Sequence, residues 1–211
     1  MDVAVVGILR GVDSGFFSEI LEVSFSAGLE ALEVTMNTKG GEAMVEKNRD
    51  RVPVGKYLGM GTIRNRDEAR RAIDAGAMFL VSPNLDTEVI EYAVSRRVPV
   101  IAGALTPTEV YEAWSAGASM IKVFPCGVMG GPQYIRELRG PFDDLPLIAV
   151  GGVTLDNLEE YFQAGVSGVG VSSSLFGKQA VRQKNPQEIA RNVKLFIDRC
   201  HKMKDSLLSP L

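Results

Sequence analysis

The stretch TPTEVYEAWSAGASMIKVFP, residues 106–125, contains one complete structural unit of this chain. Thr106 is a favoured helix N-cap, and Pro107 is tolerated in the first turn of a helix. The helix-like run that follows ends at Gly117, as expected for a left-handed helix C-cap. The apolar segment Met120–Phe124 comes next and predicts a strand. The stretch therefore predicts a helix that leads the chain into a buried strand.

The same unit recurs along the whole chain, because short apolar segments alternate with helix-like ones. Strands are expected at Val3–Leu9, Ala31–Met36, Tyr57–Ile63, Phe79–Ser82, Pro99–Ala102, Met120–Phe124, Leu147–Val150 and Val166–Val171. Helix-like segments include Phe16–Ala27, Glu68–Ala75, Glu109–Ala116, Leu155–Ala164 and a last helix from Pro186 to about Lys202. Strands that alternate with helices predict a parallel sheet.

Eight strand–helix units in 211 residues predict a small (β/α)8 barrel. No linker-like segment divides the chain, so we expect a single domain over residues 1–211. Its C-terminal end is expected to be helical from about residue 186, with a short tail at 205–211. A doubly wound open sheet is the alternative, and the absence of a GxGxxG fingerprint disfavours it.

The amino-acid composition limits the classes of partner and cofactor that the chain is expected to bind. The chain is 45% hydrophobic and 23% charged, which is ordinary for a globular protein. A net charge of −3 argues against nucleic-acid binding, and no apolar run approaches the ~20 residues of a membrane span. One histidine and two distant cysteines form no zinc pattern, although an oxygen-ligated magnesium site stays open. Without disulfide, signal-peptide or transit-peptide patterns, we expect a cytoplasmic protein with no nucleic-acid or membrane partner.

Two ionisable residues, Lys122 and Glu33, stand inside apolar strand segments. Burial disfavours an ammonium group and lowers the lysine pKa, and a neutral amine is a nucleophile for ketones. Because strand side chains alternate between faces, both residues are expected to point into the barrel lumen. A lysine that reaches solvent past an edge strand, or a purely structural Lys–Glu pair, is the alternative.

Further candidates stand at the C-terminal ends of the strands, where (β/α)8 barrels bind their substrates. Arg10 follows the first strand, where it can clamp a carboxylate or lie on the surface. Thr62 and Pro83 follow the third and fourth strands. The pair Gly151-Gly152 follows the seventh strand and the cluster Ser172–Ser174 the eighth, a pattern that favours phosphate binding over a simple turn.

Eight motifs together make the chain similar to one family from about Val5 to Phe196. The motifs are Ile8-Leu9-Arg10, Glu33-Val34-Thr35, Gly59-Met60-Gly61-Thr62, Ser82-Pro83, Thr106-Pro107-Thr108-Glu109, Lys122-Val123-Phe124-Pro125, Gly140-Pro141-Phe142 and Gly151-Gly152-Val153. The chain resembles the bacterial 2-keto-3-deoxy-6-phosphogluconate (KDPG) and 4-hydroxy-2-oxoglutarate (KHG) aldolases, which are class I pyruvate aldolases.

The resemblance implies a role for each matching residue. Lys122 is expected to form the Schiff base and Glu33 to act as general acid and base. The expected substrate-binding residues are Arg10, Thr62, Pro83, Phe124, Gly151, Gly152, Ser172 and Ser173. Thr62 helps to hold the pyruvyl carboxylate, Phe124 packs on the pyruvyl group, and the glycines with Ser173 bind phosphate. The resemblance also implies a homotrimer and a covalent Schiff base with no metal cofactor.

Three positions depart from the usual pattern of the family. Many members bind the carboxylate with an arginine where this chain has Asn37, and others use an arginine at the end of the first strand. We therefore assign the carboxylate to Arg10. Val150 replaces a threonine that is common in enzymes acting on the gluconate-derived acid, and Ala102-Gly103 replaces Pro-Gly. The stereochemistry of the sugar acid stays open.

The sequence therefore predicts an aldolase that cleaves a 2-keto-4-hydroxy acid to pyruvate and an aldehyde. The first expected substrate is 2-dehydro-3-deoxy-6-phosphogluconate, which gives glyceraldehyde 3-phosphate, and 4-hydroxy-2-oxoglutarate, which gives glyoxylate, is a further one. The alternatives are a 2-dehydro-3-deoxy-6-phosphogalactonate aldolase, a lysine-independent phosphosugar isomerase or epimerase, and a non-catalytic anion-binding barrel. The joint presence of Lys122 and Glu33 favours an aldolase.

Overall fold

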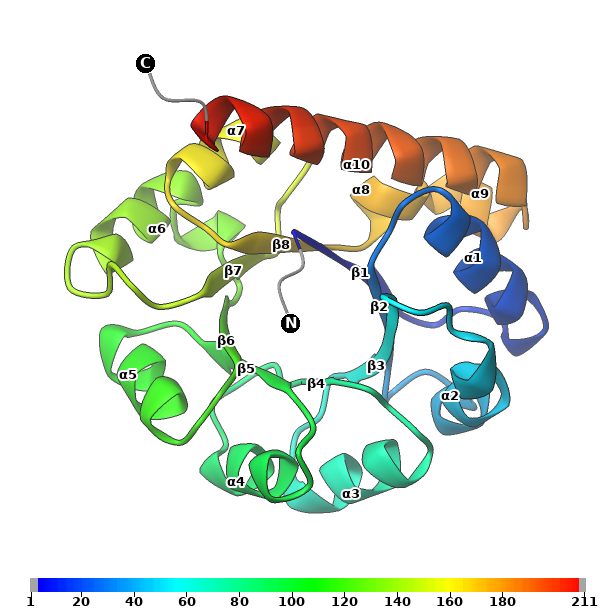
Figure 1. Cartoon of the computed structure of the whole chain (residues 1–211), viewed down its shortest axis with the longest axis horizontal. Helices are drawn as coiled ribbons and strands as arrows, with labels where there is room; N and C mark the ends of the chain where they lie inside the picture. Colours follow the sequence, from blue (N-terminus) through cyan, green and yellow to red (C-terminus); the bar gives the residue numbers. More distant parts are fainter. Residues whose placement is uncertain (1–3, 209–211) are drawn as a thin grey trace.

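The computed structural model describes the backbone of residues 4–208 and the side chains of residues 4–203. Its eight strands form a closed parallel barrel in which each strand pairs with the next and β8 pairs with β1 (Figure 1). The strands are β1 Val5–Leu9, β2 Ala31–Thr35, β3 Tyr57–Gly61, β4 Leu80–Val81, β5 Val100–Ala104, β6 Met120–Val123, β7 Leu147–Val150 and β8 Gly168–Val171. The predicted (β/α)8 barrel is confirmed, and the open sheet is wrong.

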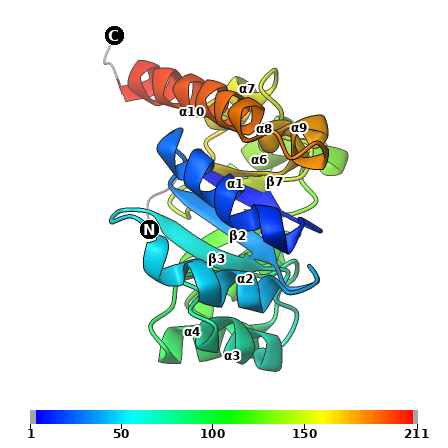
Figure 2. The ribbon, with the colours of Figure 1, turned by 90° about the vertical axis from the view of Figure 1, so that its right-hand side faces the viewer.

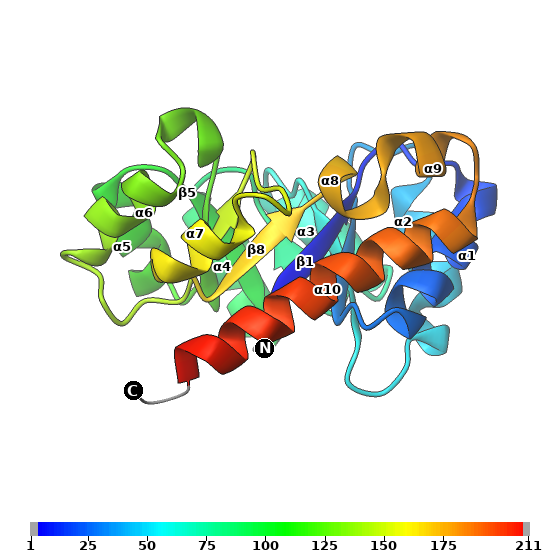
Figure 3. The same cartoon turned by 90° about the horizontal axis from the view of Figure 1, so that it is seen from above.

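Helices form a ring outside the strands (Figure 1). They are α1 Ser14–Ser26, α2 Gly41–Asn48, α3 Arg66–Asp74, α4 Thr87–Ser95, α5 Pro107–Ser115, α6 Pro132–Arg139, α7 Leu158–Gln163, α8 Ser173–Phe176, α9 Lys178–Arg182 and α10 Pro186–Leu208, with 3-10 turns η1 Arg49–Arg51 and η2 Gly127–Met129. The long helix α10 packs against α1, α7, α8 and α9. Figures 2 and 3 show it running along the outside of the barrel beside these elements.

Helix α5, which lies in the stretch 106–125, has the caps that its sequence predicts. Thr106 caps α5 in a capping box with Glu109, and Pro107 occupies the first turn. Gly117, just beyond the helix, has a φ of 100°. This left-handed turn releases the chain into β6, the strand that contains Lys122.

The predicted C-terminal tail at 205–211 is wrong in part, because α10 continues to Leu208. No glycine or proline interrupts the sequence between Pro186 and Pro210, so nothing stops the helix earlier. Residues 209–211, and Val3 at the start of the first predicted strand, lie outside the described residues.

Several elements are shorter than predicted by one to three residues at an end, among them β2, β3, β6 and β8. In β4 and α7 a side chain that bonds to the backbone of a turn accounts for the difference. Strand β4 ends at Val81, since the Ser82 hydroxyl donates to Asn84 O and accepts from Gly103 N. Helix α7 begins only at Leu158, since the Asn157 side chain accepts from Thr154 N and donates to Gly152 O.

Apolar side chains form two separate layers. The larger fills the space between the strands and the helices. The smaller lies inside the barrel and consists of Val6, Ile8, Ala31, Phe79, Val81, Ile101, Met120, Ile148 and Val150. Glu33 and Lys122 occupy the next positions on this face, two residues beyond Ala31 and Met120. The inside of the barrel is therefore filled by apolar side chains, and the ionisable residues Glu33 and Lys122 follow towards the C-terminal ends of the strands.

Candidate active site

A cavity of about 520 Å³ opens at the C-terminal ends of the strands. Its lining residues are Ile8, Arg10, Glu33, Thr62, Pro83, Lys122, Phe124, Val150, Gly151, Gly152, Val153, Thr154, Gly170, Val171, Ser172, Ser173 and Ser174. All ten site residues predicted from the sequence are among them. The volume lies within the usual range for small-molecule sites.

Lys122 lies in β6 with only 6% of its surface exposed. Because β6 pairs with β5 and β7, the alternative of a lysine reaching solvent past an edge strand is wrong. Its ammonium nitrogen lies 4.9 Å from the centroid of the Phe124 ring. Burial lowers the pKa of Lys122, Arg10 lowers it further, and Glu33 partly offsets both. The neutral amine form of Lys122 is therefore more populated than that of an exposed lysine at the same pH.

Glu33 lies in β2 and is 1% exposed. Its Oε2 atom has no hydrogen-bond partner among the described residues. Burial raises the pKa of this carboxyl to about 7, although Lys122 and Arg10 oppose the shift. Such a group exists in both protonation states near neutral pH, which is the property a general acid and base needs.

The space beside the Glu33 carboxylate depends on Gly61, the last residue of β3. A Cβ atom added at Gly61 would collide with the Glu33 carboxylate. The backbone at Gly61 does not have a positive φ, so its requirement for glycine is one of space. Gly61 belongs to the motif Gly59-Met60-Gly61-Thr62, but no pattern in the sequence predicts this role for it.

Arg10 and Thr62 form a polar corner of the cavity. The guanidinium donates from Nη2 to Thr62 Oγ1 at 3.4 Å and from Nη1 to Asn37 Oδ1 at 3.2 Å. Thr62 has a φ of 60°, which is rare for a β-branched residue. Backbone conformations of this kind concentrate at functional sites.

Gly151 and Gly152 line the cavity with φ values of 94° and 82°, which other residues rarely adopt. The segment after β6 holds them in place, since Cys126 N donates to Val150 O and Gly127 N to Gly151 O, both at 2.9 Å. Exposed Ser172 and Ser173 stand beside them on the cavity wall. This part of the wall offers hydroxyl groups and glycine backbone to an anion, and Arg10 and Lys178 line a neighbouring pocket together with Ser172 and Ser173.

Pro83 completes the rim. The Ser82 hydroxyl holds its loop, because it joins the end of β4 to Gly103 of β5. Ile8 was not selected from the sequence, although it also lines the cavity. It lies in β1, two residues before Arg10, so the alternation of strand side chains is the signal that could have identified it.

Two negative observations apply to the described residues alone. None of the helices there is long and apolar enough to cross a membrane. Within the same part of the chain, no group of three or more His, Cys, Asp or Glu residues is arranged to hold a metal ion.

Comparison with known proteins identifies the family. Residues 3–192 match the family model described as KDPG and KHG aldolase. The chain belongs to the KDPG and KHG aldolase family. It is 31% identical over 192 residues to the 2-dehydro-3-deoxy-6-phosphogalactonate aldolase of Escherichia coli K12, covering 90% of this chain and 93% of that protein. The predicted function class, a class I pyruvate aldolase, is thereby confirmed.

Other members of the KDPG and KHG aldolase family are similarly related. The 2-dehydro-3-deoxy-phosphogluconate aldolase of Pseudomonas aeruginosa is 33% identical over 136 residues, covering 64% of this chain and 61% of that protein. A solved structure described as "Native KDPGal structure" superposes with a TM-score of 0.89 at 29% identity, covering 97% of this chain and 98% of that one.

Proposed function

We propose that this aldolase cleaves a 6-phosphorylated 2-keto-3-deoxy sugar acid to pyruvate and glyceraldehyde 3-phosphate. One observation carries the proposal. A buried lysine whose pKa is lowered and a buried carboxyl whose pKa is raised share one cavity, and its wall also offers glycine backbone and serine hydroxyls. The lysine and the carboxyl suit Schiff-base chemistry, and the glycine backbone with the serine hydroxyls suits a phosphate.

The reaction begins at Lys122. Its neutral amine attacks the C2 ketone, and loss of water from the carbinolamine leaves an iminium ion. Glu33, directly or through a water molecule, takes the proton of the C4 hydroxyl as the C3–C4 bond breaks. The electrons of that bond move into the iminium, so the products are an aldehyde and an enamine. Glu33 then returns a proton to C3, and water releases pyruvate and the free lysine.

The remaining residues orient the substrate. Arg10 and Thr62 bind the carboxylate, so that the ketone lies beside Lys122 and against the Phe124 ring. Gly151, Gly152, Ser172 and Ser173 hold the phosphate at the other end, with Pro83 on the rim. The binding free energy of the phosphate is then available to orient the reacting centre.

The configuration at C4 separates two candidate substrates. The phosphogluconate-derived acid is the first expectation from the sequence. The apolar Val150 on the cavity wall favours the galactonate-derived epimer, and so does the E. coli relative that matches almost the whole chain. Measured kcat/KM for the two epimers distinguishes them. Val150→Thr is expected to shift the ratio towards the gluconate epimer, and an unchanged ratio would count against a role for Val150.

Borohydride trapping with pyruvate tests the core of the proposal. Intact-mass and peptide mass spectrometry are expected to find one pyruvate-derived adduct, located on Lys122. Lys122→Ala should give no adduct and no turnover, while Glu33→Gln should still trap pyruvate but turn over more slowly. A folded wild-type protein without an adduct, or equal trapping in Lys122→Ala, would refute the lysine mechanism.

We also propose a homotrimer that acts in the cytoplasm without a metal cofactor. Val128 and Met129, two exposed apolar side chains, lie next to each other in η2 directly after β6, where a second subunit could cover them. The buried thiol Cys126 suits a reducing compartment. Light scattering measures the assembly, cell fractionation the compartment, and turnover after chelation the need for metal.

A further inference from the structure

The proposed carboxylate ligand Arg10 has a long side chain in an exposed position at the end of β1. Such a side chain loses roughly 2 kcal/mol of conformational free energy when a ligand fixes it. A site that already holds the guanidinium in place avoids part of this loss and binds more tightly. The question is therefore which groups hold Arg10 before the substrate arrives.

Asn37 holds the side chain. It lies in the loop after β2, and its Oδ1 atom accepts a hydrogen bond from Arg10 Nη1 at 3.2 Å. On the other edge of the guanidinium, Nη2 donates to Thr62 at 3.4 Å. Two loops, one after β2 and one after β3, thus hold the guanidinium from different sides. A neutral amide at position 37 attracts a carboxylate weakly but orients a guanidinium well.

Thr38 holds the backbone next to Arg10. Its Oγ1 atom accepts from Gly11 N at 2.9 Å, and Thr38 itself is only 4% exposed. The same oxygen shares a hydrogen bond with Thr35 Oγ1 at 2.9 Å, and Thr38 N donates to Thr35 O at 2.8 Å. Thr35 is fully buried and stands two residues after Glu33 on the same face of β2.

A continuous chain of contacts therefore runs from the Glu33 strand to the guanidinium of Arg10 and to the backbone N–H of Gly11, the next residue. We propose that Asn37 and Thr38 are positioning residues that hold Arg10 ready for the carboxylate of the keto acid. The inference rests on the proposed function, in which Arg10 binds that carboxylate. In this proposal β2 has two functions. The strand supplies Glu33, which moves the proton, and the loop after it positions Arg10, which binds the carboxylate.

The test uses two ligands that differ in the carboxylate. Pyruvate carries it and acetone lacks it, while both form an imine with Lys122 that borohydride traps. The variants are Asn37→Ala and Thr38→Val. Thr38→Ser keeps the hydroxyl, and Lys39→Ala, in the same loop and exposed, is the matched surface control. Adduct formation is measured against ligand concentration by intact-mass spectrometry.

The half-saturating pyruvate concentration is expected to rise about 10-fold in Asn37→Ala and Thr38→Val, with trapping of acetone unchanged. Thr38→Ser and Lys39→Ala are expected to stay within about 3-fold of the wild type. In steady-state cleavage, the two affected variants should show the change mainly in KM, as expected when binding common to ground and transition state is lost.

Other outcomes overturn the inference. Wild-type pyruvate dependence in both variants means that Arg10 needs neither residue. Equal losses for pyruvate and acetone mean a general structural role, and so does failure of Thr38→Ser to restore binding. Because Asn37 is exposed, Asn37→Ala keeps the test decisive even if Thr38→Val does not fold. A wild-type protein that traps neither ligand would instead refute the proposed function on which the inference rests.

Discussion

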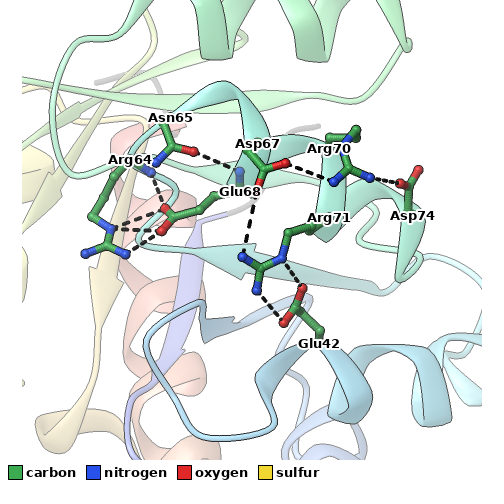
Figure 4. A network of polar contacts seen from close by, with 8 residues as sticks. All are labelled: Glu42, Arg64, Asn65, Asp67, Glu68, Arg70, Arg71 and Asp74. Atoms are coloured by element: carbon green, nitrogen blue, oxygen red, sulfur yellow. Dashed lines mark hydrogen bonds and ion pairs between the residues drawn. The ribbon is translucent and has the colours of Figure 1, made fainter.

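Charged side chains are used in opposite ways in two regions of this barrel. On the surface of α2 and α3, arginines and carboxylates pair directly (Figure 4). Arg71 donates twice to the partly exposed Glu42 at 2.8 Å, and Arg64 binds Glu68, which is only 6% exposed. The hydrogen bonds from these arginines lower the pKa of Glu42 and of Glu68. In the lumen, burial raises the pKa of Glu33 to about 7 and lowers that of Lys122.

The difference shows that the surroundings decide whether a charge serves structure or chemistry. Beside α2 and α3, hydrogen bonds from an arginine keep each carboxylate ionised, and Glu42 also has water around it, so neither carboxylate takes up a proton near neutral pH. In the lumen, burial disfavours both charged forms, and a proton is easily gained or lost. A surface pair stabilises the fold by little. The lumen pair costs stability and makes proton transfer possible.

The largest expected effect comes from moving the lumen carboxylate. Gly61→Ala places a Cβ atom where the Glu33 carboxylate lies, so Glu33 must leave its position. We expect kcat to fall by about 100-fold, the order of loss that follows a misplacement of roughly 1 Å. Steady-state cleavage of the phosphorylated keto acid measures the change.

Gly140→Ala is the matched control, because a Cβ atom there makes only an ordinary 3.4 Å contact with Glu137 O. It should leave kcat within about 2-fold. If Gly61→Ala retained full activity in a folded protein, the location of the Glu33 carboxylate would not matter for the reaction.

The next effect is on the pH dependence of the reaction. With a pKa of about 7, Glu33 loses its ionised form tenfold per pH unit on the acid side of neutrality. Wild-type kcat/KM should therefore decline as the pH falls below about 7. Glu33→Gln should be slower at all pH values and lack this decline. An identical acid limb in both proteins would assign it to another group.

A smaller effect concerns stability, and its sign follows from the same shift. The pKa of Glu33 is about 7 when folded, against 4.5 for an ordinary glutamate. The folded state therefore binds more protons between these values, and wild-type stability should decrease as pH rises through that window. Between pH 4 and pH 8, the free energy of unfolding of Glu33→Gln should therefore rise by roughly 3 kcal/mol relative to that of the wild type. Urea unfolding at several pH values measures the gain, and a constant difference would contradict it.

The smallest effect is expected on the surface. Glu42→Gln removes the bidentate pair with Arg71 and should lower the free energy of unfolding by less than about 1 kcal/mol. Because the pKa of Glu42 is lowered, this contribution is present at neutral pH and is lost as the pH falls below the ordinary glutamate range. Denaturant unfolding at neutral and acid pH measures it, with kcat unchanged. A large loss of activity would show that the two regions are coupled.

Much of the barrel was predictable from the sequence, because its signals are local. Thr106 and Gly117 mark the two ends of α5, and the apolar alternation around Lys122 and Glu33 marks the strands and their inward face. Element ends were less predictable where a side chain competes with the backbone ladder. Ser82 shortens β4 in this way, and Asn157 delays α7.

All ten predicted site residues line one cavity, whereas the residues behind them were not predicted. Gly61 matters through its distance to Glu33, which lies on another strand. The proposed roles of Asn37 and Thr38 rest on contacts with Arg10 and Gly11, more than 20 residues away in the sequence. Contacts of this kind depend on the register between neighbouring strands, which no local pattern contains.

The hydrogen bonds from Cys126 N and Gly127 N to the backbone after β7 have a consequence for how the active site can evolve. They extend the β6–β7 pairing beyond the strands, so peptide groups connect the lysine strand to Gly151 on the cavity wall. Main-chain hydrogen bonds, not side chains, therefore set the distance between Lys122 and Gly151. If Gly151 holds the phosphate as proposed, substitution of wall side chains such as Val150 is expected to change the preferred stereoisomer, whereas the number of carbon atoms between ketone and phosphate is expected to stay the same.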